Sequence, residues 1–202
     1  MKNNLSYITD FLYSILPDVY TVQIAVLNGN HFKILKEKLK NIPTDKLLEI
    51  ASGTSPILEH FSFKKYVGID FDKRFIEKAK KKYKNPNYNF IVGNANKLEI
   101  KGDFDVILLS HATHHFSDEL VKKVMKDILM LNFKYLIIYD GKPIGYLSPI
   151  LYKLDLGNNF REIEQLQEFF KSNKNYKIIK SEVFRSNRPF YKYPLIVAKR
   201  VK

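Results

Sequence analysis

Two carboxylates, Glu49 and Asp70, stand 21 residues apart, and each lies at or beside the end of a short apolar segment. In open α/β sheets, ligands bind at the carboxyl ends of the strands. A carboxylate about 20 residues beyond the first strand is where a nucleotide's ribose hydroxyl groups find their acceptor. We therefore expect Asp70 to bind a ribose and the adjacent Phe71 to pack on an adenine face. Alternatively, Asp70 or Asp72 only caps the next helix.

The turn after Glu49 distinguishes two classes of nucleotide. It reads Ala51-Ser52-Gly53-Thr54-Ser55-Pro56, and small residues let a ligand approach the backbone closely. A dinucleotide needs the pattern GxGxxG for its anionic pyrophosphate, and two of those three glycines are missing here. The carboxylate of Glu49 repels a pyrophosphate but attracts the ammonium and sulfonium groups of S-adenosylmethionine. The sign of the charge therefore favours the methyl donor over a dinucleotide. An ordinary strand-to-helix turn with a surface Glu49 is the alternative that involves no ligand.

Two further strand ends supply candidate ligand contacts. The apolar segment 89–92 is followed by Gly93-Asn94-Ala95, where the Asn94 side chain and the Ala95 N–H are candidates to meet adenine nitrogens. The segment 104–109 is followed by Ser110 and His111, which we expect at the floor of the same cleft. Imidazole titrates near neutral pH, so His111, nearest to the strand end, is the candidate general base.

Two more histidines, His114 and His115, follow closely. Metal binding is one interpretation of the pattern His111-x-x-His114-His115, but it has no carboxylate partner at an obvious spacing. We favour packing within the loop for His114 and His115, and we expect no metal site.

Hydrophobic periodicity predicts a doubly covered, mostly parallel sheet. Helical spacing dominates residues 1–44, and from Lys46 onward strands and helices alternate. Ser55 and Ser117 are candidate helix N-caps, with Pro56 at a first helical position. The last two strands have no helix between them and are expected to form an antiparallel hairpin. The expected strands are 47–50, 66–69, 89–92, 104–109, 135–139, 176–184 and 194–201, and the expected helices lie at 5–16, 32–39, from 55, 73–83, 117–130 and 160–170.

Composition limits the possible functions. The chain has 202 residues, enough for one domain, and no cysteine, which excludes disulfides, cysteine metal sites and thiolate nucleophiles. No apolar run is long enough to span a membrane, and the N-terminus does not read as a signal peptide, so we expect a cytoplasmic protein. The net charge is +13, and residues 174–202 carry nine basic groups and one acidic group. Such a basic surface can attract nucleic acid, anionic lipid or an acidic small substrate, but solubility is the favoured explanation because lysine is abundant along the whole chain.

These segments, in this order, resemble the class I S-adenosylmethionine-dependent methyltransferases over about residues 46–140. Residues 49–55 look like the family's acidic-x-Gly-x-Gly-x-Gly loop, with Ala51 and Ser55 in place of glycines, and Gly93-Asn94-Ala95 resembles its Gly-Asp-Ala segment. The resemblance implies a Rossmann-like, seven-stranded α/β sheet with helices on both faces and an antiparallel last strand. Because the sequence has no repeat, low-complexity tract or Pro/Gly linker, we expect one domain, with 1–44 as a helical N-terminal cap and 45–202 as the core.

The resemblance also implies roles for the site residues. Glu49 lies near the methionine ammonium, and Asp70 binds the ribose. The remaining cofactor contacts are expected from Ala51, Ser52, Gly53, Phe71, Asn94, Ala95 and Ser110. Because two glycines and the usual Asp are replaced, a non-catalytic relative stays open as an alternative.

The acceptor is expected to be a small molecule. Enzymes that methylate base amino groups carry Asp/Asn-Pro-Pro-aromatic after the fourth strand, where this chain reads Ser110-His111-Ala112-Thr113. Carbon-5 pyrimidine methylation relies on a thiolate, which the chain lacks. A basic RNA-binding or RNA-modifying protein on the same fold is the second hypothesis. The acceptor pocket is expected to draw on Tyr13, Tyr20, Asp140, Lys142, Tyr146 and Tyr152.

Overall fold

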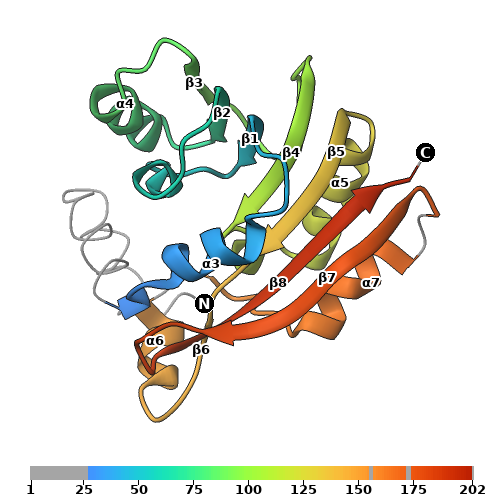
Figure 1. Ribbon diagram of the computed structural model, residues 1–202. Coiled ribbons are helices and arrows are strands. Elements are labelled where there is room, and N and C mark those ends of the chain that lie inside the picture. The colour runs from blue at the N-terminus through green and yellow to red at the C-terminus, as the bar shows by residue number, and fades with distance from the viewer. Residues whose placement is uncertain (1–26, 155–156, 172–173, 202) are drawn as a thin grey trace.

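The computed structural model describes residues 27–154, 157–171 and 174–201. Within these ranges the chain forms one twisted sheet with helices on both faces (Figure 1). The expected helix at 5–16, together with Tyr13 and Tyr20, lies outside the described residues. Among the described helices, none is long and apolar enough to cross a membrane.

The sheet has the strand order β3-β2-β1-β4-β5-β8-β6, with β7 paired to β8. Strands β1 to β5 are mutually parallel, and β8 runs antiparallel to its neighbours β5, β6 and β7. The fold class predicted from the sequence is therefore confirmed. The expected count of seven strands omitted β6, which has only two residues. The strands are β1 (Lys46–Ile50), β2 (Lys65–Asp70), β3 (Tyr88–Val92), β4 (Asp103–Ser110), β5 (Asn132–Tyr139), β6 (Lys142–Pro143), β7 (Tyr176–Arg185) and β8 (Tyr191–Arg200).

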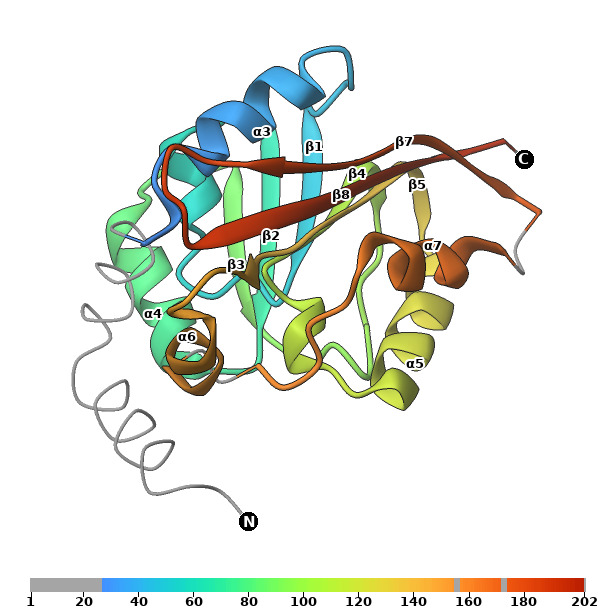
Figure 2. The same cartoon turned by 90° about the horizontal axis from the view of Figure 1, so that it is seen from below.

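Helices cover the two faces of the sheet and bury a separate apolar cluster on each. Figure 2 shows α3 and α5 on opposite sides of the sheet. Side chains of α3 and α4 belong to one cluster, and those of α5 and α7 belong to the other. The described helices are α3 (His31–Leu39), α4 (Lys73–Lys82), α5 (Asp118–Leu129), α6 (Ser148–Leu154) and α7 (Ile163–Lys171), with short 3-10 turns η1 (Pro56–Glu59) and η2 (Thr113–His115).

Of the two helix N-caps expected from the sequence, Ser117 is confirmed and Ser55 is wrong. The Ser117 side chain accepts a hydrogen bond from the Leu120 N–H at 3.2 Å and caps α5. Ser55 caps nothing, because its backbone is left-handed and its hydroxyl is hydrogen-bonded to the Tyr66 hydroxyl at 2.8 Å. The segment that starts at Pro56 is one 3-10 turn rather than an α-helix.

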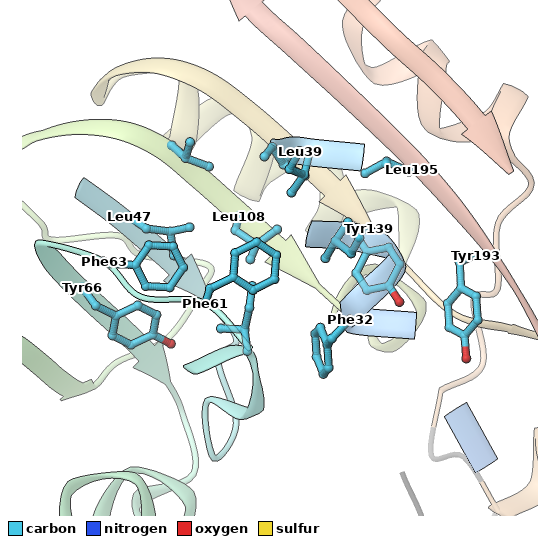
Figure 3. Packing of buried hydrophobic residues seen from close by; sticks show 14 of the residues in the cluster. Phe32, Leu39, Leu47, Phe61, Phe63, Tyr66, Leu108, Tyr139, Tyr193 and Leu195 are labelled. Carbon is cyan, nitrogen blue, oxygen red and sulfur yellow. The ribbon is translucent and has the colours of Figure 1, made fainter. Parts of the chain in front are cut away.

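Aromatic rings link the N-terminal helix to the far strands of the sheet. The rings of Tyr139 at the end of β5 and Tyr193 on β8 stack with centroids 5.6 Å apart, and Phe32 of α3 faces them (Figure 3). All three side chains are buried. This packing places the start of α3 over the carboxyl ends of β4 and β5.

Candidate functional site

A cavity of about 260 Å³ opens at the carboxyl ends of β1 and β4, where the start of α3 faces the sheet. Its size lies just below the range of about 300–1,000 Å³ typical of small-molecule sites. Three segments meet there: the turn after β1, the loop after β4 and the N-terminal end of α3. The lining residues are Gly29, His31, Phe32, Glu49, Ala51, Ser52, Gly53, Thr54, Pro56, Glu59, His60, Ser110 and His111.

The turn after β1 has left-handed backbone at alternate positions. The φ angles of Ala51, Gly53 and Ser55 are 57°, 54° and 57°. These are the positions that resemble the three glycines of the methyltransferase loop, so the backbone keeps that shape although two side chains are present. A Cβ built on Gly53 would meet nothing within 4 Å, which leaves open space for a ligand against this backbone.

Glu49 places a carboxyl group in the cavity. The side chain is buried, and the Tyr66 hydroxyl donates a hydrogen bond to its Oε2. Burial raises the pKa of Glu49 to about 8, although the bond from Tyr66 acts in the opposite direction. A cationic ligand in the cavity would favour the ionised form. The site is therefore suited to the ammonium or sulfonium of S-adenosylmethionine rather than to an anion.

Asp70 supports the turn from behind and is not among the cavity-lining residues. Its Oδ2 accepts a hydrogen bond from the Gly53 N–H at 2.8 Å, and its Oδ1 accepts one from the Asp72 N–H at 2.9 Å. Burial raises the pKa of Asp70 above its usual range, against the effect of these two bonds. Each carboxylate oxygen can still accept a second hydrogen bond. Asp72, accepting from the Arg74 N–H, is the residue that caps α4.

The residues expected around adenine flank the turn outside the cavity. Phe71 is 75% exposed, which leaves its ring available for stacking. Asn94 is exposed, and its Oδ1 accepts a hydrogen bond from the Asn96 N–H at 3.1 Å, while Ala95 is half-buried. Asn94 therefore stabilises its own turn, and the Ala95 backbone lies next to it.

Ser110 and His111 form the other wall. Ser110 is buried, and His111 adopts φ 50°, which turns its half-buried ring into the cavity. A Cβ on Gly141 would stand 3.1 Å from His111 Cε1, so the loop after β5 gives this ring its space. The ring of His111 lies edge-on to those of His31 and Tyr139, with centroids 5.2 and 5.0 Å away. His111 is therefore held in one orientation by its neighbours.

Comparison with known proteins points to the methyltransferases. Residues 47–131 match the family model of a methyltransferase domain. In fold, the chain is similar to solved S-adenosylmethionine-dependent methyltransferases. The open backbone at Gly53 and the buried carboxyl group of Glu49 fit S-adenosylmethionine, the methyl donor of such methyltransferases. When bound, it supplies the methyl group on a sulfonium.

Three solved structures illustrate the similarity. Magnesium protoporphyrin IX methyltransferase (ChlM) from Synechocystis PCC 6803, with bound SAH, is 16% identical, with a TM-score of 0.69 over 96% of this chain and 99% of that one. N-methyltransferase NodS from Bradyrhizobium japonicum WM9, also with S-adenosyl-l-homocysteine, is 13% identical, with a TM-score of 0.66 over 85% and 86%. Protein PH0226 from Pyrococcus horikoshii OT3 is 22% identical, with a TM-score of 0.61 over 86% and 93%. No curated protein sequence matched the chain.

Sequence reasoning missed His31 as a residue of the candidate site. His31 lines the cavity and is buried, and its Nδ1 lies 2.5 Å from the Tyr139 hydroxyl. Burial, followed by the nearby His111, lowers the pKa of His31 to about 2, so its ring is neutral. Tyr139 stays protonated because burial raises its pKa, and its O–H donates to His31 Nδ1. Only the placement of α3 against β5 brings these residues together.

The second histidine of the loop has a structural partner. His114 Nδ1 lies 2.5 Å from Asp140 Oδ1, and both side chains are buried. Although burial alone would raise it, the positive charge and hydrogen bond of His114 hold the pKa of Asp140 well below its usual range. Asp140 Oδ2 also accepts from Thr113 and from the His114 N–H. The pair joins the loop after β4 to the end of β5, and His115 is exposed beside it.

Other residues expected at the acceptor pocket lie away from the cavity. Lys142 pairs with Glu162 at 2.7 Å, and Tyr146 is fully exposed. The Tyr152 hydroxyl donates to the Pro143 carbonyl at 3.3 Å. Within the part of the chain that the structure describes, no three His, Asp or Glu side chains are grouped as metal ligands.

Proposed function

We propose that this protein transfers a methyl group from S-adenosylmethionine to a small-molecule acceptor. The observation that carries the proposal is a single cavity lined by both Glu49 with the Gly53 turn and His111. It supports a geometry in which the cofactor's methyl-bearing end and the acceptor atom meet. The acceptor atom, O, N or C, is left open. The name of one similar structure, magnesium protoporphyrin IX methyltransferase, is in line with a small-molecule acceptor.

We assign the cofactor contacts by their places in the fold. Glu49 is placed to attract the ammonium, and the backbone of Ala51 and Gly53 is open to close approach. Asp70 is assigned to the ribose through the free lone pairs of its carboxylate, in addition to its support of the turn. The other assigned contacts are Ser52, Phe71, Asn94, Ala95 and Ser110.

His111 is assigned as the general base for an acceptor that carries a proton. Methyl transfer is an in-line displacement, in which proximity and orientation supply much of the rate. An imidazole within hydrogen-bond reach of an acceptor hydroxyl or amine removes its proton as the new bond forms. A base is not required when the acceptor atom already has a free electron pair.

Calorimetry tests the cofactor part of this proposal. S-adenosylmethionine and S-adenosylhomocysteine are titrated into the full chain and into Glu49→Gln, with Glu99→Gln, an exposed glutamate paired only with Lys97, as the matched control. We expect both ligands to bind the parent, with at least about tenfold weaker binding by Glu49→Gln and unchanged binding by the control. Absence of heat and of a thermal shift at millimolar ligand would remove the proposal.

A specific observation supports RNA as a second candidate acceptor or ligand. Arg185, the last residue of β7, and Arg188, in the turn between β7 and β8, are both exposed. Arg188 lies against Gly29 at the edge of the cavity. Binding that weakens steeply as salt rises would support this candidate. Absence of binding at low salt would exclude it.

The cytoplasmic location and the division into a cap over 1–44 and a core over 45–202 stay predictions.

A further inference from the structure

Four rings line the part of the cavity beyond the glycine turn. His31 and Phe32 come from the first turn of α3, His60 follows η1, and His111 follows β4. The Phe32 ring stacks on His60 with centroids 5.2 Å apart and lies 4.1 Å from the His31 ring. Such ring faces pack well against another flat ring, in stacked or edge-to-face arrangements.

The formal charges in this cavity are acidic although the chain is strongly basic. Glu49 and Glu59 are the carboxylates among its lining residues, and none of the lining residues in the described ranges is a lysine or an arginine. The net charge of the chain is +13. The basic excess is therefore located elsewhere than in the cavity.

Positively charged side chains contact several lining residues from outside the cavity. The Lys36 ammonium donates to the His60 carbonyl at 2.9 Å, and Lys82 pairs with Glu59. Arg188 Cγ lies beside Gly29, and its side chain is exposed. Residues 1–26 contain a single lysine, Lys2, and two aspartates. An anionic group deep in the cavity would face the carboxyl group of Glu49, and no lysine or arginine of the described residues lines the cavity beside it.

His31 adds no positive charge to the cavity. Its ring is buried and neutral, because burial and the neighbouring His111 lower its pKa. Its Nδ1 is already bonded to Tyr139. An anion placed among these rings would lose its hydration without a compensating ion pair.

From this arrangement we infer that the acceptor is a small aromatic molecule, uncharged or cationic, whose ring lies among His31, Phe32, His60 and His111. The inference rests on the proposed function and adds the chemical class of the acceptor. Anionic acceptors, including phosphorylated and carboxylated ones, are selected against at this site. Cationic rings gain from the faces of the aromatic side chains.

Four probes with related skeletons test the inference. They are 2-(4-hydroxyphenyl)ethanol, which is neutral, tyramine, which is cationic, 4-hydroxyphenylacetate, which is anionic, and 2-cyclohexylethanol, which lacks the aromatic ring. Binding of each to the full chain saturated with S-adenosylhomocysteine is measured by NMR titration at pH 7. We expect the neutral and cationic aromatic probes to bind at least about tenfold more tightly than the anionic one and than the cyclohexyl one.

A charge variant shows where binding occurs. His60 is exposed and lines the cavity, so His60→Lys adds a cation to the wall with little effect on the core. Because both aromatic probes lose the same contact with the His60 ring, we expect the affinity ratio of 4-hydroxyphenylacetate to 2-(4-hydroxyphenyl)ethanol to shift about tenfold toward the anion. Met130→Lys adds the same charge at an exposed position after α5 and should change none of the affinities.

The outcomes separate this inference from the proposed function. Failure of S-adenosylhomocysteine to bind, measured first by calorimetry, refutes the cofactor assignment. If it binds but 4-hydroxyphenylacetate binds as tightly as the other aromatic probes, or if no probe binds, the acceptor class is wrong and the cofactor assignment stands. An unchanged preference in His60→Lys would also contradict it.

Discussion

Asn30 and Asn187 exchange two hydrogen bonds across 157 residues of sequence. The Asn30 N–H donates to Asn187 Oδ1 at 3.0 Å, and the Asn187 N–H donates to Asn30 Oδ1 at 2.9 Å. The preceding Gly29, at φ 58°, leaves space for this contact, because a Cβ there would stand 2.1 Å from Asn187 Oδ1. Tyr193 adds a further bond by donating to Asn28 Oδ1 at 2.6 Å. The turn between β7 and β8 thus positions the start of α3, which carries one wall of the cavity.

Breaking this contact should loosen that wall. We expect Asn187→Ala to lower the free energy of unfolding by about 1 kcal/mol, because it removes the side-chain acceptor of one bond at an exposed site. It should also weaken cofactor binding, since Gly29 and His31 line the cavity. Urea unfolding and calorimetry measure the two effects. Asn85→Ala, which removes one local bond to the Asn87 N–H, is the control and should leave cofactor affinity unchanged.

The left-handed turn makes opposite predictions for two neighbouring positions. Ala51→Gly relieves a backbone conformation that costs an L-residue about 1–2 kcal/mol, part of which is offset by greater freedom of the unfolded chain. We expect a gain of about 0.5 kcal/mol in the free energy of unfolding. Gly53→Ala should lower the free energy of unfolding by about 1 kcal/mol. It should also weaken cofactor binding, because the new methyl group occupies the open space. A loss of stability in Ala51→Gly together with a gain in Gly53→Ala, measured in denaturant melts, would show that backbone strain does not govern this turn.

Cofactor binding should release a proton through Glu49. Its pKa of about 8 means that the carboxyl group is mostly protonated at pH 7, whereas a bound cation favours the ionised form. We expect affinity for S-adenosylmethionine to rise between pH 6 and pH 7.5. Calorimetry in two buffers of different ionisation enthalpy counts the protons released. Glu49→Gln should show no such release, and an identical count in parent and variant would contradict the assignment.

Glu49 should also make the free energy of unfolding depend on pH, in the direction opposite to that of cofactor affinity. Because the pKa of Glu49 is raised from 4.5 to about 8 in the folded chain, the folded state binds more protons than the unfolded state between these values. The contribution of Glu49 to the free energy of unfolding therefore falls as pH rises through that window. Chemical unfolding of the ligand-free chain from pH 5 to 8 should show a flatter profile for Glu49→Gln than for the parent. Parallel profiles would argue against a buried, protonated carboxyl group.

The buried pair of His114 and Asp140 should contribute strongly to stability. Asp140→Asn leaves the imidazole of His114 without its charged partner, and we expect a loss of about 3 kcal/mol in the free energy of unfolding at pH 7. Because the pKa of Asp140 is lowered, the stabilisation is present above its unfolded value of 3.8 and is lost as pH falls below it. The variant and parent should therefore converge in acid. Asp103→Asn, at an exposed aspartate, is the control and should cost less than about 0.5 kcal/mol.

Local pattern alone determined which strand ends could carry chemistry. Parallel strands bring their carboxyl ends to one edge, so Glu49, Gly53, Ser110 and His111 were expected at one site from their positions after apolar segments. The structure brings all four to the cavity. The cap of Ser117 was predictable for the same reason, since capping depends on a few adjacent residues.

Only the tertiary structure decided the rest. His31 and His60 line the cavity because α3 and η1 pack there, and no local spacing encodes that contact. Asp70 is hydrogen-bonded to the Gly53 N–H and is not among the residues that line the cavity, and Ser55 is hydrogen-bonded to Tyr66 instead of capping a helix. Side-chain direction and long-range hydrogen bonds depend on which elements pack together, and sequence periodicity carries little of that information.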